Sequence, residues 1–295
     1  MDHLETITER LAHWYRAAAR PLPWRAPGVS PWGVLVSEVM LQQTPVPRVA
    51  PAWSAWLERW PEPADLAADP PGEAVRAWGR LGYPRRALRL HAAACACVES
   101  YEGRVPDTYA ALRALPGVGD YTAAAVLAFA YGQRAVVLDT NVRRVHARLL
   151  GGHAFEPAGA PTRAERDRAE ALLPAEPAAA AEVSVAVMEL GVVICAARSP
   201  ACPACPVAGD CAWLAAGQPA WHGPPRHGQS YAGTDRQARG ALLAVLRGAA
   251  DAVPRAALEA AWPADPTQRE RALDSLVADG LVEPLARGRY RLPLT

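Results

Sequence analysis

The amino-acid sequence predicts an all-α fold. Apolar residues recur at spacings of three and four through most of the 295 residues, and Pro or Gly falls between these runs. A glycine-rich turn, Leu115-Pro116-Gly117-Val118-Gly119, separates two of the runs. Four cysteines follow within 17 residues of the second half. These observations indicate a helical protein with one specialised turn and one loop built to hold a metal or a cluster.

The predicted helices follow the periodic runs in chain order. They are 3–19, 31–43, 47–59, 63–68, 71–80, 84–101, 107–114, 120–131, 140–150, 163–173, 178–194 and 203–208. Ser30 and Pro31 form a typical helix start, with Ser as the cap and Pro in the first turn. Residues 216–235 are rich in Gly, Pro, Gln and His, and we expect them to form a linker.

The pattern changes after this linker. Residues 236–247, 254–262 and 267–279 predict three short helices, and residues 281–285 and 289–293 predict a hairpin. Three helices followed by a hairpin resemble a winged helix. A small helical cap that enters no DNA groove explains the same pattern equally well, so 236–295 is expected to be a separate C-terminal module of either kind.

Composition excludes one class of chemistry. All 31 basic residues are Arg, so a mechanism that needs a lysine Schiff base is impossible. The net charge of +1 argues neither for nor against nucleic acid. No apolar run reaches the roughly 18 residues of a membrane span, and the N-terminal helix is charged, unlike a signal peptide. We expect a cytoplasmic, nucleoid-associated monomer, with Cys95 and Cys97 as buried thiols.

Two runs of arginine contain no acid. They comprise Arg76, Arg80, Arg85, Arg86 and Arg89, and then Arg143, Arg144 and Arg148. Either run could line a path for phosphates. For each run taken alone, a solvated basic helix face is the more common explanation.

The four cysteines are Cys195, Cys202, Cys205 and Cys211, spaced Cys-x6-Cys-x2-Cys-x5-Cys. Thiolates this close together form a cage for zinc or for an iron–sulfur cluster. Colour and absorbance would separate the two. Such cysteines without an export signal indicate a reducing compartment.

The glycine-rich turn has the features of a phosphate-binding hairpin. Pro116 ends the helix before it, and Gly117 and Gly119 permit a tight turn and a close backbone approach. The first amides of the following helix then face outward, where they attract a phosphate. A Gly-Val-Gly turn alone is weak evidence, because many helical hairpins contain one.

Two carboxylates stand where they could act in catalysis. Asp139 precedes the helix 140–150, so it should cap that helix and stay ionised at neutral pH. Glu38 lies in an apolar helix beside Val34 and Leu35, where burial should raise its pKa and suit it to donate a proton. An ordinary cap and an ordinary buried Glu are the structural alternatives.

Taken together, these motifs resemble the adenine DNA glycosylase (MutY-type) family of the helix-hairpin-helix superfamily. The resemblance covers residues 1 to about 215. It includes the strings Leu22-Pro23-Trp24-Arg25, Ser37-Glu38-Val39-Met40-Leu41-Gln42-Gln43-Thr44 and Leu81-Gly82-Tyr83, then the hairpin, Asp139 and the cysteines. It implies a six-helix barrel domain at 25–135, and a [4Fe–4S] cluster domain formed by 1–24 with 136–215.

The resemblance also implies roles for individual residues. Glu38 would protonate the departing adenine at N7, and Asp139 would stabilise the sugar cation with Tyr121 and Asn141. Strand-cutting relatives carry Lys where this chain has Tyr121, so a monofunctional glycosylase is expected. The residues expected to contact DNA or the target base are Trp24, Arg25, Gln42, Gln43, Thr44, Leu81, Tyr83, Gly117, Gly119 and Arg143. Within that set, Gln43 would fill the gap in the base stack, and Leu81 and Tyr83 would wedge beside the orphan base. The hairpin loop could also hold a monovalent cation.

Two departures from the family pattern leave alternatives open. Ser184 and Val185 stand where many members have Asn-Gln, which weakens the prediction of adenine as the base. The NUDIX-like domain that recognises 8-oxoguanine in many members has no counterpart in residues 236–295. The expected partner is double-stranded DNA with a mismatched adenine. A thymine or uracil mismatch glycosylase, or a non-catalytic cluster protein that binds DNA, are the alternatives.

Overall fold

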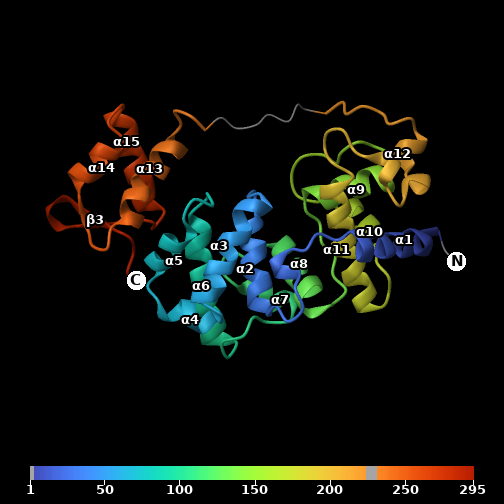
Figure 1. Ribbon diagram of the computed structural model, residues 1–295, viewed down its shortest axis with the longest axis horizontal. Coiled ribbons are helices and arrows are strands. Elements are labelled where there is room, and N and C mark those ends of the chain that lie inside the picture. Colours follow the sequence, from blue (N-terminus) through green and yellow to red (C-terminus); the bar gives the residue numbers. More distant parts are fainter. Residues whose placement is uncertain (1–2, 224–230) are drawn as a thin grey trace. The chain divides into compact units, whose positions relative to one another are not determined.

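A computed structural model describes residues 3–223 and 231–295, and the described chain is mostly helical (Figure 1). The α-helices are α1 (His3–Ala18), α2 (Pro31–Leu41), α3 (Val46–Arg59), α4 (Pro63–Ala68), α5 (Pro71–Trp78), α6 (Arg85–Ser100), α7 (Tyr109–Ala114), α8 (Asp120–Tyr131), α9 (Thr140–Leu149), α10 (Arg163–Leu172), α11 (Pro177–Val193), α12 (Ala212–Ala215), α13 (Asp235–Gly248), α14 (Arg255–Ala261) and α15 (Pro266–Ala278). Short 3-10 turns are η1 (Pro23–Arg25), η2 (Cys202–Ala204), η3 (Ala208–Asp210) and η4 (Ala286–Gly288). The strands are β1 (Val253–Pro254), β2 (Glu283–Leu285) and β3 (Arg289–Arg291).

Most predicted helices are present, and the differences have local causes. The predicted helix 31–43 ends at Leu41, because Gln43 takes a left-handed conformation with φ of 56°. The predicted helix 203–208 is wrong. Two 3-10 turns, η2 and η3, stand there instead, interrupted where Cys205 adopts an extended backbone. The middle of the predicted linker, 224–230, lies outside the described residues.

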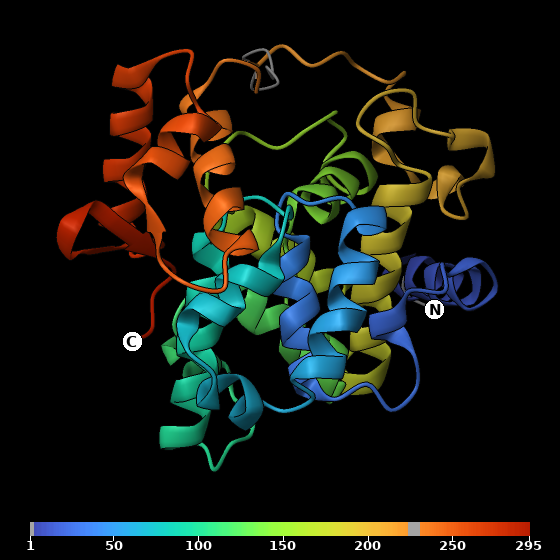
Figure 2. The ribbon, with the colours of Figure 1, turned by 60° about the vertical axis from the view of Figure 1, so that its left-hand side comes forward.

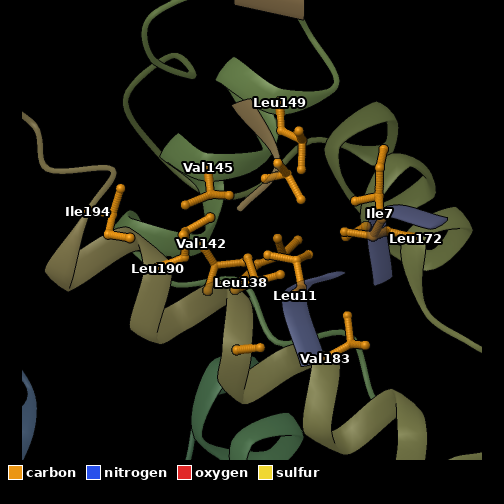
Figure 3. Close-up of a cluster of buried hydrophobic side chains, with 14 residues drawn as sticks. Ile7, Leu11, Leu138, Val142, Val145, Leu149, Leu172, Val183, Leu190 and Ile194 are labelled. Atoms are coloured by element: carbon orange, nitrogen blue, oxygen red, sulfur yellow. The ribbon is translucent and has the colours of Figure 1, made fainter. Parts of the chain in front are cut away.

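Contacts divide the chain into two compact units, each of which has its own core. The first unit contains the described residues up to Val34, then Asp107–Arg113 and the described residues from Val118 to 223. Its core is formed by α1, α9, α10 and α11, whose apolar side chains interlock in Figure 3. Ile7 and Leu11 from α1 are fully buried there among Val142, Val145 and Leu190. Burying each such side chain contributes roughly 1.5–3 kcal/mol.

The second unit contains Leu35–Pro106, Ala114–Gly117 and the described residues 231–295. Three buried tryptophans form the centre of its helical part. Trp56 meets Trp60 and Trp78 edge-to-face, with ring centroids 4.7 and 5.8 Å apart. Such pairs add about 0.5–1.5 kcal/mol beyond the burial of their area. The interlocked rings fix α3 against α5, which precedes the Leu81-Gly82-Tyr83 segment.

The C-terminal part of this unit confirms the predicted hairpin and adds a strand. Helices α13, α14 and α15 pack with a three-stranded antiparallel sheet of order β1-β3-β2, and Figure 2 shows α13 beside α5. Arg287 turns the hairpin with φ of 62°. The added strand is β1, in which Val253 pairs with Tyr290 of β3. It has only two residues and is too short to be recognised from its sequence.

No single helix among the described residues is long and apolar enough to cross a membrane. One pair, α10 with α11, passes the same length and composition test jointly, across a bend of 118°. Much of α11 is buried in the core of the first unit.

Candidate functional site

Asp139 caps α9, as its place before a helical run predicts. Its Oδ1 accepts the Val142 N–H at 2.6 Å, and its Oδ2 accepts Nδ2 of Asn141 at 3.0 Å. Its pKa is raised, because burial outweighs these hydrogen bonds and the charge of Arg144. Burial is thus the largest influence on this pKa, and the hydrogen bonds of the cap limit the rise. The result is a carboxylate oriented by two donors in a partly desolvated setting.

A buried arginine connects this carboxylate to the cysteine loop. Nη2 of Arg144 donates to Oδ1 of Asn141 at 3.0 Å, and Nε donates to the Cys195 carbonyl at 2.7 Å. The same guanidinium also donates to the Gly191 carbonyl. A Cβ on Gly191 would lie 3.0 Å from the Cβ of Asn141, so a side chain there would crowd α9. A series of hydrogen bonds therefore orients the candidate catalytic carboxylate and runs from Asp139 through Asn141 and Arg144 to Cys195.

The arginine run 143–148 faces the interior, which contradicts both the phosphate path and the solvated face. Arg148 lies between the rings of Trp213 and Phe155, and donates to Cys195 Sγ at 3.4 Å and to the Ala196 carbonyl at 2.8 Å. Arg143 pairs with Glu165 and donates to the carbonyls of 157 and 159. The predicted DNA contact of Arg143 is not supported, since its guanidinium holds a loop of its own unit.

The four predicted ligand cysteines lie on one loop and influence one another. Burial raises the pKa of the Cys205 thiol to about 11, and the charges of the other three cysteines add to the rise. Donors point at two of the sulfurs: Arg148 at Cys195, and Nε2 of Gln218 at Cys202 at 3.7 Å. Within residues 3–223 and 231–295, no group of three or more His, Cys, Asp or Glu side chains is placed so that it could hold a metal ion.

Glu38 is buried in α2, with 5% of its surface exposed, as its apolar neighbours predict. Val34 and Leu35, the neighbours expected from helical spacing, are also buried. Removal from water is one of the effects that penalise the ionised form of a carboxyl group. The burial that a general acid requires is therefore present at this position.

Two exposed turns of the second unit share one buried anchor, Arg86. The turns carry Gln43 and Tyr83, non-glycine residues in the left-handed region with φ of 56° and 47°. Arg86 donates to the Gln42 carbonyl at 2.6 Å and to the Gly82 carbonyl at 3.1 Å. Thr44 completes the link, because its hydroxyl donates to the Leu81 carbonyl and accepts from Arg86. Burial lowers the pKa of Arg86 to about 10.

The structure separates the two predicted wedge residues. Tyr83 is 47% exposed, whereas Leu81 is 4% exposed and faces the core. Leu81 is therefore not presented as a wedge in this conformation, and its carbonyl instead binds Thr44. Gln43 is exposed and Gln42 half-buried. Strain at positions 43 and 83 costs about 1–3 kcal/mol each, and such strain is common at ligand-contacting turns.

The hairpin requires glycine at only one of its two positions. Gly117 has φ of 80°, and a Cβ there would meet the Arg89 side chain at 2.7 Å. Gly119 has an extended backbone and open space around it, so the fold itself does not require glycine there. Gly119 instead precedes the first turn of α8. Nearby, Tyr121 packs on a cluster of small residues with Ala125 and Val137.

Arg25, one of the two predicted pocket residues, pairs with a buried acid. Glu189 is fully buried and accepts hydrogen bonds from Arg20 and Arg25, the latter at 2.9 Å. Although burial alone would raise the pKa of Glu189, these two arginines hold it below its ordinary value. Trp24 is buried, so the structure shows an ion-pair anchor here and no exposed base contact.

Sequence reasoning missed three side chains: Arg86, Arg144 and Glu189. Arg86 and Arg144 stood in the two arginine runs and were assigned there to the surface. An acid in the apolar run of α11 was the available signal for Glu189, because an acid buried in such a run needs a cationic partner. Ser184, at the departure from the family pattern, is buried in the same helix.

Comparisons with known proteins identify relatives of this chain. Residues 36–170 match the family described as HhH-GPD superfamily base excision DNA repair protein. The chain is 54% identical over 285 residues to the adenine DNA glycosylase of Mycobacterium tuberculosis, which covers 96% of this chain and 92% of that relative.

Two further matches concern other bases. Over 205 residues the chain is 35% identical to the thymine/uracil-DNA glycosylase of Pyrobaculum aerophilum, covering 68% of this chain and 88% of that protein. The solved structure of a thermostable thymine-DNA glycosylase superposes with a TM-score of 0.65 at 27% identity, covering 72% of this chain and 96% of that one. The similarity to the M. tuberculosis enzyme is thus both higher and longer.

Proposed function

Because the chain belongs to the adenine DNA glycosylase family of the HhH-GPD superfamily, we propose that it hydrolyses the N-glycosidic bond of adenine mispaired with 8-oxoguanine or guanine in double-stranded DNA. The observation that carries this proposal is the carboxylate of Asp139, which two donors orient at the start of α9. A fixed anion stabilises the oxocarbenium-like sugar that forms as the base leaves.

In the proposed mechanism, Glu38 acts from its buried position in α2 and gives a proton to N7 of adenine. The carbon–nitrogen bond then breaks, and Asp139 stabilises the sugar cation until water adds. Asn141 orients that carboxylate, and Tyr121 contributes beside it. Gln43 fills the gap that the extrahelical base leaves in the DNA stack, and Tyr83 wedges beside the orphan base. Both residues lie on turns with left-handed backbone.

Strand cleavage is not part of the proposed activity. The chain contains no Lys, and strand-cutting relatives use a Lys where this chain has Tyr121. Without that amine, no side chain can form a Schiff base with the abasic sugar. The product is therefore an intact strand with an abasic site.

We also propose that the four cysteines hold a [4Fe–4S] cluster. The donor set fits, since four thiols share one loop and nitrogen donors of Arg148 and Gln218 approach two of the sulfurs. Such donors stabilise cluster thiolates. When bound, the cluster would brace this loop and take no part in the hydrolysis. The barrel (25–135), cluster domain (1–24 with 136–215) and winged-helix module (236–295), a monovalent cation at the hairpin, a monomeric state and a cytoplasmic location complete the proposal.

A glycosylase assay tests the proposal. Duplexes with A, T or U opposite 8-oxoguanine or guanine are incubated with the purified chain, then analysed with and without alkali. We expect breaks only at adenine and only after alkali. Release of thymine would contradict adenine as the substrate and favour the activity for which the P. aerophilum relative is named. Breaks without alkali would contradict the monofunctional assignment.

A further inference from the structure

The C-terminal module is docked on the two helices that flank the exposed turn of Tyr83. That turn, 79–84, connects α5 to α6 within the second unit. The module contacts α5 through α13 and meets the start of α6 through the end of α15. The turn is therefore held from both sides by a part of the chain that has no other assigned role.

Two arginines exchange hydrogen bonds across the contact with α5. Arg76, in the last turn of α5, donates to the carbonyls of Arg247 and Ala249 at the end of α13. Arg247 donates back to the Val75 carbonyl at 2.9 Å. Arg76 thereby satisfies carbonyls that a helix end leaves without partners, and its charge suits the negative end of α13. Burial in this contact lowers the pKa of Arg247 to about 10.

The segment that follows β3 makes a second contact with α5, and this contact is tightly packed. The Gly72 N–H donates to the Pro293 carbonyl at 2.8 Å. A Cβ on Gly72 would lie 2.5 Å from the Pro293 oxygen and 2.9 Å from Leu292 Cβ. Only glycine permits this approach, because any side chain would push the module away from α5.

The contact with α6 is an ion pair at its first residue. Arg85 lies 3.2 Å from Asp279, which follows α15, and Asp279 also accepts from Arg239 of α13 at 2.6 Å. Arg85 is two residues from Tyr83. One acid thus joins the module's own packing to the residue that begins α6.

We propose that the C-terminal module is a positioning element for the Tyr83 turn: by clamping Gly72–Arg76 on one side and Arg85 on the other, it sets the position from which Tyr83 meets DNA. This inference rests on the proposed glycosylase function for the role of Tyr83. It accounts for a module that offers few free cations to phosphates, since Arg239, Arg247, Arg255 and Arg271 are engaged by protein groups.

Gly72→Ala in the full-length chain tests the proposal, with Gly248→Ala as its matched control. Each variant adds one methyl group to a helix, but the Cβ at 248 meets nothing within 4 Å. Alanine also favours the helix at both sites, so a specific loss at 72 reports the docking. Two quantities are measured: amide hydrogen exchange of residues 79–84, and the single-turnover rate constant for adenine opposite 8-oxoguanine.

We expect Gly72→Ala to speed exchange in 79–84 and to lower the rate constant about five-fold or more, or ~1 kcal/mol of barrier. The reaction amplitude per total protein should remain unchanged, because simple unfolding would lower that amplitude and leave the rate constant unchanged. Gly248→Ala should match the unmodified chain in both measurements.

Faster exchange in 289–293 together with an unchanged turn and rate constant would overturn the proposal. If Gly72→Ala leaves the module docked, Arg247→Ala removes the donor to Val75 and is judged by the same two readouts. Absence of adenine release by the unmodified chain would instead refute the glycosylase function. In that case hydrogen exchange still decides whether the module controls the turn.

Discussion

Replacing Arg86 by Met should destabilise the second unit and disturb both exposed turns together. The guanidinium donates to the carbonyls of Val39 and Met40 at 2.8 and 3.2 Å, in the last turn of α2. Carbonyls in the last turn of a helix receive no hydrogen bond from the helix itself. The Gly82 carbonyl, by contrast, would still accept a hydrogen bond from the indole N–H of Trp78, at 2.9 Å. Two buried carbonyls therefore lose their donor, at about 1–3 kcal/mol each.

We expect the free energy of unfolding to fall by about 2–6 kcal/mol in Arg86→Met. Arg86→Lys should recover only part of this loss, because an ammonium group lacks the planar fork that reaches both turns. Arg48→Ala, an exposed change on α3, is the control and should stay within about 0.5 kcal/mol. Urea unfolding followed by tryptophan fluorescence measures all three. A loss below about 1 kcal/mol in Arg86→Met would refute the assignment of Arg86 as the shared anchor.

Three further outcomes are expected. Asp139→Asn should abolish adenine release but retain DNA binding, as measured by single-turnover and gel-shift assays; an active variant would remove Asp139 from the mechanism. Asn141→Ala removes a hydrogen bond that lowers the Asp139 pKa, so the acidic limb of the rate profile should move to higher pH, and an unmoved limb would contradict this. Burial lowers the pKa of His146 from 6.5 to about 4, so the folded state resists its protonation and stability should fall as pH drops through that window, by about 3 kcal/mol. His146→Leu should flatten this acid dependence in thermal unfolding, and an identical dependence would contradict it.

The raised pKa of Asp139 also has consequences for stability, with a definite sign. The protonated carboxyl suits its buried setting, so this contribution to stability is fully present below the ordinary pKa of 3.8. It is lost as pH rises through the raised folded value. Activity has the opposite requirement, because only the ionised form stabilises a sugar cation. The fold therefore gives up some stability at this residue in order to hold an anion where the chemistry needs one.

Features with local causes could be predicted from the sequence. Asp139 caps a helix three residues before the amide it binds, and Glu38 is buried by neighbours within one helical turn. The hairpin at Arg287 likewise depends on adjacent residues. In each case the partners lie within a few positions, so spacing and residue type contain the information.

Long-range anchors could not be predicted in this way. Arg86 and Arg144 bind mainly backbone carbonyls, at separations of 44 and 51 residues for the Gln42 and Cys195 oxygens. Every residue offers a carbonyl, so no residue type marks the acceptor. Glu189 meets Arg20 across 169 residues, which only the packing of α1 on α11 brings together. The burial of Leu81 was missed as well, and the Thr44 hydroxyl that binds its carbonyl lies 37 residues away in the sequence.

The absence of lysine therefore has a structural meaning as well as a chemical one. Arg86, Arg144, Arg148 and Arg247 are buried or half-buried, and each donates to backbone carbonyls of distant segments. A guanidinium can do this because it has five donors in a fixed plane, whereas an ammonium group is a compact and strongly hydrated charge. Lysine at these positions would bind fewer carbonyls and cost more to desolvate. The same residue type that rules out Schiff-base chemistry thus holds the cysteine loop, the two exposed turns and the C-terminal module in place.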